Sequence, residues 1–356
     1  MTIRTRTGFD ADALLRAAAA DGEGGPRRDL ARAYRELSAR YRGGSDTPDD
    51  SALTDRHVQA YLAARLPATL AASRAVLVEL AERRPLWQPA SLLDLGAGPG
   101  PAMWAALETF AGITRIDLVE RSSRMIGAGQ RLASHATTAT ATAATTVTDV
   151  GAGAATALRS ARWHRGAAQA PPPVDDADLT LASYLLGELP ADERGPALAA
   201  WWHATNGALV LIDTGTPDGY ARILAARAAL LADGATITAP CPSDGPCPLP
   251  AGDWCHFSRR VERSAAHRAL KDADLGHEDE KFAYLVASRG EPAHAAGRVL
   301  RAPRAHSGHV RLVLCTSDGR GETVVARSRR DEFRWARRAR WGDAAPPTVA
   351  ETARST

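Results

Sequence analysis

Four cysteines are the side chains in this sequence whose type and spacing are best suited to chemistry: Cys241, Cys247, Cys255 and Cys315. Thiolates bind soft metal ions and iron–sulfur clusters. Stretches of five, seven and 59 residues separate them, which does not match the CxxC pairs of zinc ribbons. The residues alone leave open zinc, an iron–sulfur cluster or buried thiols without a ligand, and His256 is an alternative donor beside the third cysteine.

Disulfide bonds are the less favoured use of these cysteines, because we expect the chain to lie in the cytoplasm. No apolar run approaches the roughly 18 residues that a membrane-spanning helix needs, and the first 25 residues lack the apolar stretch of a signal peptide. The sequence therefore predicts a cytoplasmic protein with no membrane partner.

A glycine-rich turn follows the apolar run Ser91 to Leu95 and precedes a helical pattern. Its sequence is GAGPG, residues 96–100, and Glu120 ends the next apolar run. Such a turn brings backbone N–H groups close to a ligand, and a carboxylate at the following strand end can accept hydrogen bonds from ribose hydroxyls. The arrangement resembles the cofactor-binding half of class I methyltransferases, which implies S-adenosylmethionine rather than NAD. The predicted cofactor-binding residues are Asp94, Gly96, Ala97, Gly98, Gly100, Glu120, Ser183 and Tyr184.

The position where a catalytic residue is expected is less informative. Many amino-methylating enzymes of RNA and DNA carry an Asn/Asp-Pro-Pro-aromatic tetrad after the fourth strand, and here that strand runs into SYLLGE, residues 183–188. The tetrad is missing, so no residue is identified as a catalytic base and the presence of enzymatic activity stays open.

The elements that must position these residues follow from the apolar pattern. Residues 8–85 are predicted to be helical, and strands are predicted at 91–95, 113–120, 159–164, 177–183 and 208–213. Strands that alternate with helices predict an α/β fold of the class I methyltransferase, Rossmann-like type. Paired strands are expected at 309–315 and 322–326. The predicted organisation is a helical part at 1–85, a methyltransferase-like domain at 86–239, a cysteine-rich, partly β module at 240–343 and a disordered tail at 344–356.

Charge is concentrated late in the chain. The net charge is only +3, but residues 320–340 hold eight arginines and three acids, with aromatic residues between them. Such a segment can pair with phosphates and stack on bases, or form a solvated helix that packs its aromatic face on the core. The candidate RNA-binding residues are Arg327, Arg329, Arg330, Arg334, Arg337, Arg338 and Arg340. A second polar run, 259–284, contains both lysines of the chain and is compatible with a solvated helix face.

Several segments resemble the methyltransferase-like family known from mitochondrial small-ribosomal-subunit assembly, which includes bacterial members. The most specific are CPSDGPCPLPAGDWCHFSRRVER and HEDEKFAYLVASR, and the similarity extends over about residues 57–343. The resemblance implies a four-iron four-sulfur cluster on the four cysteines, with zinc as the alternative, and association with the small ribosomal subunit or its RNA. The chain departs from the family at Asp213, where the family often has Glu before a Pro-Gly pair, and Thr214 stands in place of that Pro.

The function implied by this resemblance is that of a small-subunit-associated, methyltransferase-like protein of ribosome assembly and translation, with rRNA as the candidate methyl acceptor. One alternative is a non-catalytic rRNA-binding assembly factor on a methyltransferase scaffold. Another is a zinc-containing methyltransferase of small molecules. A monomer is the favoured oligomeric state.

Overall fold

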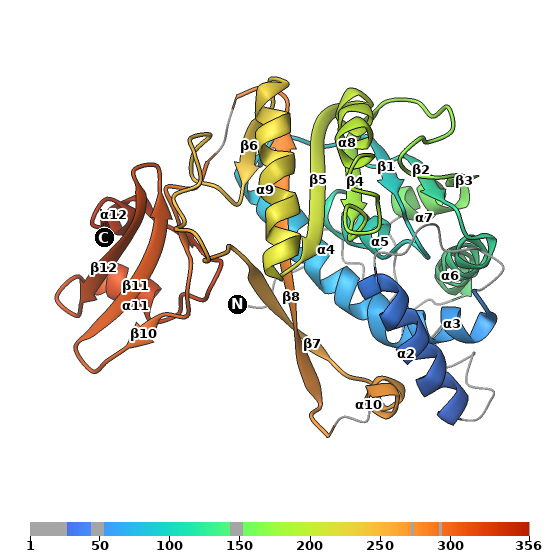
Figure 1. The fold of residues 1–356 in the computed structure, drawn as a ribbon, viewed down its shortest axis with the longest axis horizontal. Helices are drawn as coiled ribbons and strands as arrows, with labels where there is room; N and C mark the ends of the chain where they lie inside the picture. Colours follow the sequence, from blue (N-terminus) through green and yellow to red (C-terminus); the bar gives the residue numbers. More distant parts are fainter. Residues whose placement is uncertain (1–26, 44–52, 143–151, 272–273, 292–293, 356) are drawn as a thin grey trace. The chain divides into compact units, whose positions relative to one another are not determined.

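The structure, a computed structural model, is drawn in Figure 1. It describes residues 27–43, 53–142, 152–271, 274–291 and 294–355. The chain forms two compact units from interleaved stretches: the first takes residues 1–81, 86–212 and 259–280, and the second takes 82–85, 213–258 and 281–356. Among the helices of the described residues, none combines the length and apolar character required to traverse a lipid bilayer.

A parallel sheet forms the centre of the first unit. Its strands are β1 (Ser91–Leu95), β2 (Arg115–Glu120), β3 (Arg162–Arg165), β4 (Ala177–Ser183) and β5 (Thr205–Thr214). They lie in the order β3-β2-β1-β4-β5, and each neighbouring pair is parallel. All five residues of β1 are buried, as expected of a parallel strand covered on both faces. This order, which reverses direction between β1 and β4, confirms the predicted class I methyltransferase fold.

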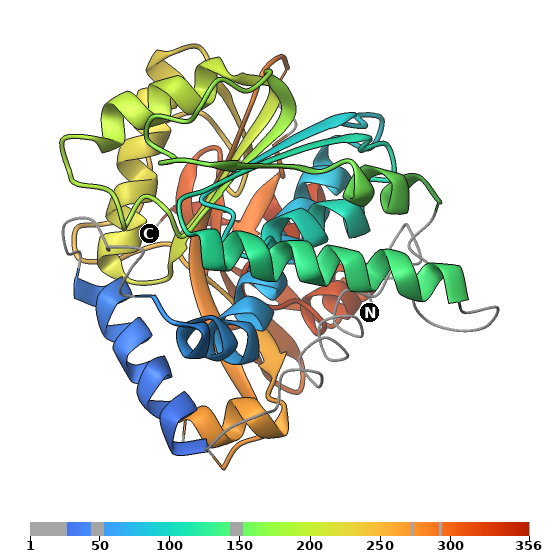
Figure 2. The same ribbon diagram turned by 90° about the vertical axis from the view of Figure 1, so that its right-hand side faces the viewer.

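Helices cover both faces of this sheet. They are α4 (Leu66–Arg83), α5 (Pro101–Thr109), α6 (Ser123–Thr142), α7 (Ala152–Arg159) and α8 (Arg194–His203). Right-handed crossovers require α5 and α8 to lie on opposite faces, because the chain moves in opposite directions along the sheet before and after β3; Figure 2 shows this arrangement. The Ala/Thr-rich stretch that begins near residue 133 continues α6 as far as Thr142.

The predicted helical N-terminal part is present in the described residues as α2 (Arg27–Gly43), α3 (Asp55–Ala60) and the π-helical turn η2 (Tyr61–Arg65), which leads into α4. Thr54 caps α3: its side chain accepts from the His57 N–H while the His57 ring accepts from the Thr54 N–H. The predicted helix at residues 8–26 lies outside the described residues.

The sequence of the polar run at 259–284 was compatible with one solvated helix face. The structure does not form such a helix there. It forms strand β7 (Phe257–Glu262), helix α10 (Ala265–Lys271) and strand β8 (His277–Ser288). Charge pairs join these elements, since Glu278 accepts from both Arg263 and Lys271. The many charged residues of this run are typical of a solvated helix, but on the paired strands β7 and β8 they do not recur with the period of a helix.

The second unit contains helix α9 (Pro217–Ala232), strand β6 (Thr236–Ala239), which pairs antiparallel with β8, and a small antiparallel sheet. The order in this sheet is β13-β9-β11-β12-β14, and β10 pairs with β11. Its strands and the helices beside them are β9 (Gly297–Val299), β10 (Arg304–Ala305), β11 (His309–Thr316), β12 (Gly319–Ala326), β13 (Ala344–Ala345), β14 (Arg354–Ser355), α11 (Arg330–Ala336) and α12 (Pro347–Ala350).

The predicted strand pair 309–315 and 322–326 is confirmed as β11 and β12, whose register runs from His309 opposite Ala326 to Thr316 opposite Gly319. Residues 344–355, expected to be a disordered tail, instead form β13, α12 and β14. The physical reason is apolar burial, because Val349 is fully buried in the same core as Val310, Leu312 and Leu314.

Candidate functional site

The glycine-rich turn leaves the carboxyl end of β1 with three left-handed glycines, Gly96 (φ 64°), Gly98 (φ 54°) and Gly100 (φ 88°). A side chain at Gly96 would meet Leu185, whose Cδ1 lies 2.9 Å from the position of a Cβ there. At Gly98 the nearest atom is the Tyr61 hydroxyl, 3.5 Å away. The turn therefore brings its backbone against the end of β4 and beneath a tyrosine of the helical part.

Two carboxylates hold this turn in place. Glu120 accepts hydrogen bonds from the N–H groups of Gly98 (2.9 Å) and Ser122 (2.8 Å), and Asp94 accepts from the Met103 N–H at the start of α5 (3.2 Å). Burial raises the pKa of both acids, and the pKa of Asp94 reaches about 7. The predicted residues Asp94, Gly96 to Gly100 and Glu120 are thus brought together, while the role of Glu120 at a ribose stays a prediction.

Ser183 and Tyr184 lie at the end of β4, beside this turn. Tyr184 has a left-handed backbone (φ 60°), its N–H donates to the Ile212 carbonyl (2.6 Å), and its hydroxyl donates to Glu280 Oε1 (2.8 Å). The Arg65 guanidinium lies 6.0 Å from the centre of the Tyr184 ring. Sequence reasoning missed Tyr61, Arg65 and Glu280 as neighbours of the site, although Glu280 lies in the distinctive HEDEKF segment.

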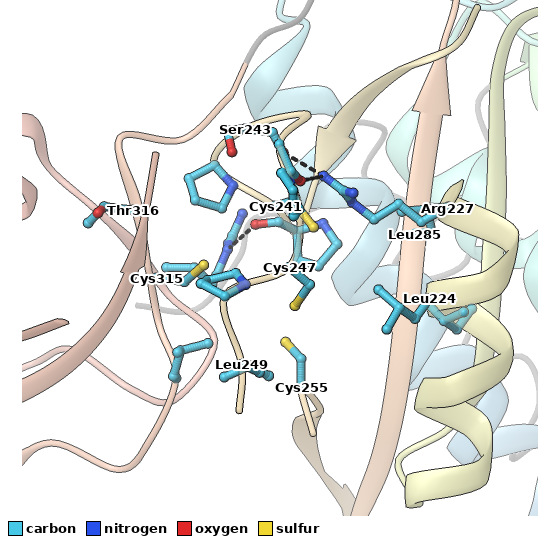
Figure 3. Close-up of a pocket in the computed structure, with 18 of the residues that line it drawn as sticks. Leu224, Arg227, Cys241, Ser243, Cys247, Leu249, Cys255, Leu285, Cys315 and Thr316 are labelled. Carbon is cyan, nitrogen blue, oxygen red and sulfur yellow. Dashed lines mark hydrogen bonds between the residues drawn. The ribbon is translucent and has the colours of Figure 1, made fainter. Parts of the chain in front are cut away.

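The four cysteines line one cavity of about 390 Å³ within the second unit. Figure 3 shows their side chains directed toward the same space, between helix α9 and the small sheet. Cys241, Cys247 and Cys255 come from the loop after β6, and Cys315 comes from β11. The structure therefore gathers the four residues that the sequence singled out as a donor set.

Two buried arginines support the loop that carries these cysteines. Arg227 Nη2 donates to the carbonyls of Ser243 (2.8 Å) and Gly245 (2.7 Å), and Arg298 donates to the carbonyls of Pro240 (2.9 Å) and Gly342 (3.0 Å). Arg298 lies directly opposite Cys315 in the β9–β11 pair. The backbone on both sides of Cys241 is thus held by guanidinium groups, which composition and spacing could not predict.

The electrostatics of the cavity oppose free thiolates. Burial raises the pKa of Cys241, Cys255 and Cys315, to about 12 for Cys315, and the neighbouring cysteines add to the increase because thiolates repel one another. Nearby Arg227 and Arg298 act in the opposite direction on Cys241 and Cys315. Cationic iron or zinc in the cavity would supply the charge that holds these groups as thiolates.

The arrangement of the four cysteine sulfurs limits which metal ion or cluster fits the cavity. A zinc ion bound by four thiolates holds each sulfur at about 2.3 Å, and among the described residues no group of three or more His, Cys, Asp or Glu side chains is arranged to hold a metal ion. Four thiols suit a thiolate-ligated group in kind, but here they line a cavity and are not arranged as the ligands of a single ion.

His256 is not among the residues that line the cavity. Its ring stacks on Trp254 (centroids 5.3 Å apart) and lies 4.4 Å from the Trp341 ring. This packing favours an aromatic contact over the alternative of a metal ligand.

Comparison with known proteins adds the family. The family model described as "Mitochondrial small ribosomal subunit Rsm22" matches residues 55–346. The chain belongs to this family. The match confirms the resemblance found in the sequence, and it extends over both units of this Rsm22-family chain.

Curated relatives of the Rsm22-family chain match at lower coverage. Human "Ribosome assembly protein METTL17, mitochondrial" is 28% identical over 302 residues, which are 80% of this chain and 62% of METTL17. The fission yeast "Rsm22-cox11 tandem protein 2, mitochondrial" is 27% identical over 226 residues, 48% of this chain and 29% of that protein. The chain thus spans about three fifths of the first relative's length and less than a third of the second's.

A solved structure, magnesium protoporphyrin IX methyltransferase from Synechocystis PCC 6803, covers 75% of this chain and 99% of its own. The TM-score of 0.36 and the sequence identity of 13% are too low for this likeness to bear on activity.

The arginines predicted to bind RNA lie on and beside α11 of the Rsm22-family chain. Six of the seven are exposed: Arg327, Arg330, Arg334, Arg337, Arg338 and Arg340. Two of the seven are paired with acids, Arg329 with Glu332 (3.3 Å) and Arg334 with Asp331 (2.8 Å).

Two aromatic residues between these arginines are partly buried. Phe333 and Trp335 pack against the core of the small sheet. The segment therefore matches the expectation of a basic surface whose aromatic face packs on the core.

Proposed function

We propose that this chain binds the small ribosomal subunit through its RNA during subunit assembly. Membership of the Rsm22 family is the observation that carries the proposal. The exposed arginines beside α11 supply the positive charge that phosphates require, and the partly buried aromatic residues there pack on the core of the small sheet. METTL17 is named a ribosome assembly protein, which agrees with this assignment.

We also propose that S-adenosylmethionine binds at the glycine-rich turn. The support is local: the Gly98 backbone lies beneath Tyr61, and Glu120 is fixed at the strand end by two N–H groups. In this role Glu120 would accept from ribose hydroxyls and the turn would approach the cofactor closely. Methylation of rRNA is a separate proposal. It does not follow from cofactor binding, because the segment that begins with Ser183 and Tyr184 lacks the tetrad that holds an amino group in many amino-methylating enzymes.

We propose, in addition, an iron–sulfur cluster on Cys241, Cys247, Cys255 and Cys315. A donor set of four thiols around a cavity of about 390 Å³ suits a group larger than one ion. The iron ions of the cluster, when bound, would supply the positive charge that keeps the four sulfurs deprotonated, while the four thiolates would leave the whole assembly with a net negative charge. Its role would be structural, because it would join the loop after β6 to β11 and so order the sheet that carries α11.

One experiment tests these proposals together. The full chain is purified without oxygen as wild type, as Cys247→Ser and as the control Ser243→Ala, which alters the same loop but no sulfur. Iron and sulfide content, binding of S-adenosylhomocysteine and co-sedimentation with small subunits are then measured. Iron in the wild type and control but not in Cys247→Ser supports the cluster, and one zinc per chain rejects it.

Co-sedimentation separates the remaining alternatives. Wild type that sediments with small subunits and transfers a labelled methyl group to their RNA supports an rRNA methyltransferase. Sedimentation without cofactor binding favours a non-catalytic scaffold. No sedimentation, even at low salt, rejects the ribosomal proposal and favours a methyltransferase of small molecules.

A further inference from the structure

Helix α9 presents two polar side chains to the cysteine cavity. Tyr220 and Arg227 are seven residues apart, close to two turns, so both lie on one face of the helix. Ile223 and Leu224, between them, line the same wall. Arg222 has a different partner and binds Asp213 through two nitrogens at 2.7 Å each. The face of α9 toward the cavity is therefore apolar apart from one hydroxyl and one guanidinium.

Tyr220 contacts a cysteine directly. Its hydroxyl oxygen lies 3.2 Å from Cys247 Sγ, within hydrogen-bonding distance for sulfur. When Cys247 is a thiolate ligand it has no proton to give, so the tyrosine hydroxyl is the donor. A hydrogen bond to a ligand sulfur withdraws negative charge from it.

Arg227 brings a buried charge to the same cavity. The residue is only 6% exposed, and its Nη2 donates to two carbonyls of the loop between Cys241 and Cys247. In the described part of the chain no carboxylate forms an ion pair with it, and its Nε has no hydrogen-bond partner. A buried cation without an acid is costly, and an anionic group in the cavity would compensate it.

We propose that Tyr220 and Arg227 are positioning residues for the thiolate-ligated cluster, which they hold and whose reduction potential they raise. The inference rests on the proposed cluster. Tyr220 acts through the Cys247 sulfur, and Arg227 acts through its charge and through the loop carbonyls that fix the spacing of Cys241 and Cys247. Both a hydrogen bond to a ligand sulfur and a nearby positive charge stabilise the more negative, reduced cluster.

The test is a redox titration with dithionite of the anaerobically purified full chain, followed by visible absorption and electron paramagnetic resonance. Tyr220→Phe and Arg227→Gln are each expected to shift the midpoint potential to more negative values. Arg227→Lys keeps the charge but cannot hold two carbonyls in the same geometry, so its potential stays near the wild-type value while a chelator removes iron several-fold faster.

The matched control is Ser317→Ala. Ser317 lines the same cavity from an exposed position and hydrogen bonds to Asp318 (3.3 Å), so its replacement should leave the potential unchanged. If Tyr220→Phe and Arg227→Gln both bind iron and keep the wild-type midpoint potential, this inference is overturned while the proposed cluster stands. If Arg227→Gln does not fold, Tyr220→Phe decides, since it keeps the ring. A wild type without iron overturns both this inference and the proposed cluster.

Discussion

The hydroxyl of Tyr184 donates a hydrogen bond to Glu280 across 2.8 Å and so joins the end of β4 to the start of β8 within the first unit. The two residues are 96 positions apart in the sequence. Tyr184 adopts its left-handed backbone just after the carboxyl end of β4, and this hydrogen bond helps to fix the residue there.

A double-mutant cycle tests this hydrogen bond. Tyr184→Phe and Glu280→Ala should each lower the free energy of unfolding, and their effects should fall short of additivity by about 1 kcal/mol, typical of one hydrogen bond. Urea unfolding of the two single variants and the double variant gives the coupling. Additive effects would show that the hydrogen bond contributes nothing to stability.

Two glycines of α6 give a matched pair of substitutions. A methyl group at Gly129 would lie 2.2 Å from Trp163 Cη2 and 3.1 Å from the Pro99 carbonyl, whereas at Gly127 the nearest atom is an arginine nitrogen at 3.5 Å. Gly129→Ala should therefore destabilise the protein by about 1 to 3 kcal/mol. Gly127→Ala should stabilise it by about 0.5 to 1 kcal/mol, because alanine favours helix. Equal effects in urea unfolding would contradict the packing described here.

Asp94 should make stability depend on pH. Its pKa is raised by burial from 3.8 to about 7, so the folded state binds the proton more tightly than the unfolded state. The free energy of unfolding should then fall as pH rises from about 4 to about 7, by a few kcal/mol in total. Asp94→Asn should melt at a higher temperature than wild type at pH 8 and at a similar temperature near pH 4, because asparagine is neutral throughout.

The control for Asp94 is the exposed Asp192→Asn, which should follow the wild type at every pH. Some dependence on pH should persist in Asp94→Asn, since the pKa of Glu120 is also raised by burial. A melting temperature that rises over this range in both variants and in the wild type would show that Asp94 is ionised without penalty.

The exposed arginines should determine how RNA binding depends on salt. Replacing Arg330, Arg337 and Arg338 by glutamine should reduce the slope of log affinity against log salt for single-stranded oligouridine, by about 0.7 for each phosphate that the protein no longer neutralises. Arg334→Gln is the control, because that side chain is paired with Asp331. Filter binding over a range of salt measures both, and equal slopes in all variants would place the RNA surface elsewhere.

The sequence was most informative where a strand is buried on both faces. The runs at 91–95 and 177–183 were predicted with the bounds that β1 and β4 have. β3 was expected at 159–164 and lies at Arg162–Arg165, because its four residues are all at least partly exposed and carry little apolar signal. The prediction was weakest in the polar segments, where β7, α10 and β8 are defined by pairing and by charge contacts rather than by apolar period.

The candidate site likewise contains residues that the sequence could predict and residues that it could not. The four cysteines could be singled out because thiols are rare in the chain and few other roles suit them. Arg227 and Arg298 could not, since two arginines among many give no signal until folding places them against the cysteine loop. Cytoplasmic localisation, the domain boundaries and the monomeric state stay predictions.

The interleaving of the two units has a consequence for synthesis of the chain. Residues 259–280 complete the first unit, but they follow Cys241, Cys247 and Cys255. Much of the second unit, including Cys315, comes later still. Three of the four cysteines must therefore leave the ribosome before the first unit is complete, and the nascent chain carries an incomplete set of thiols while the first unit still lacks residues 259–280.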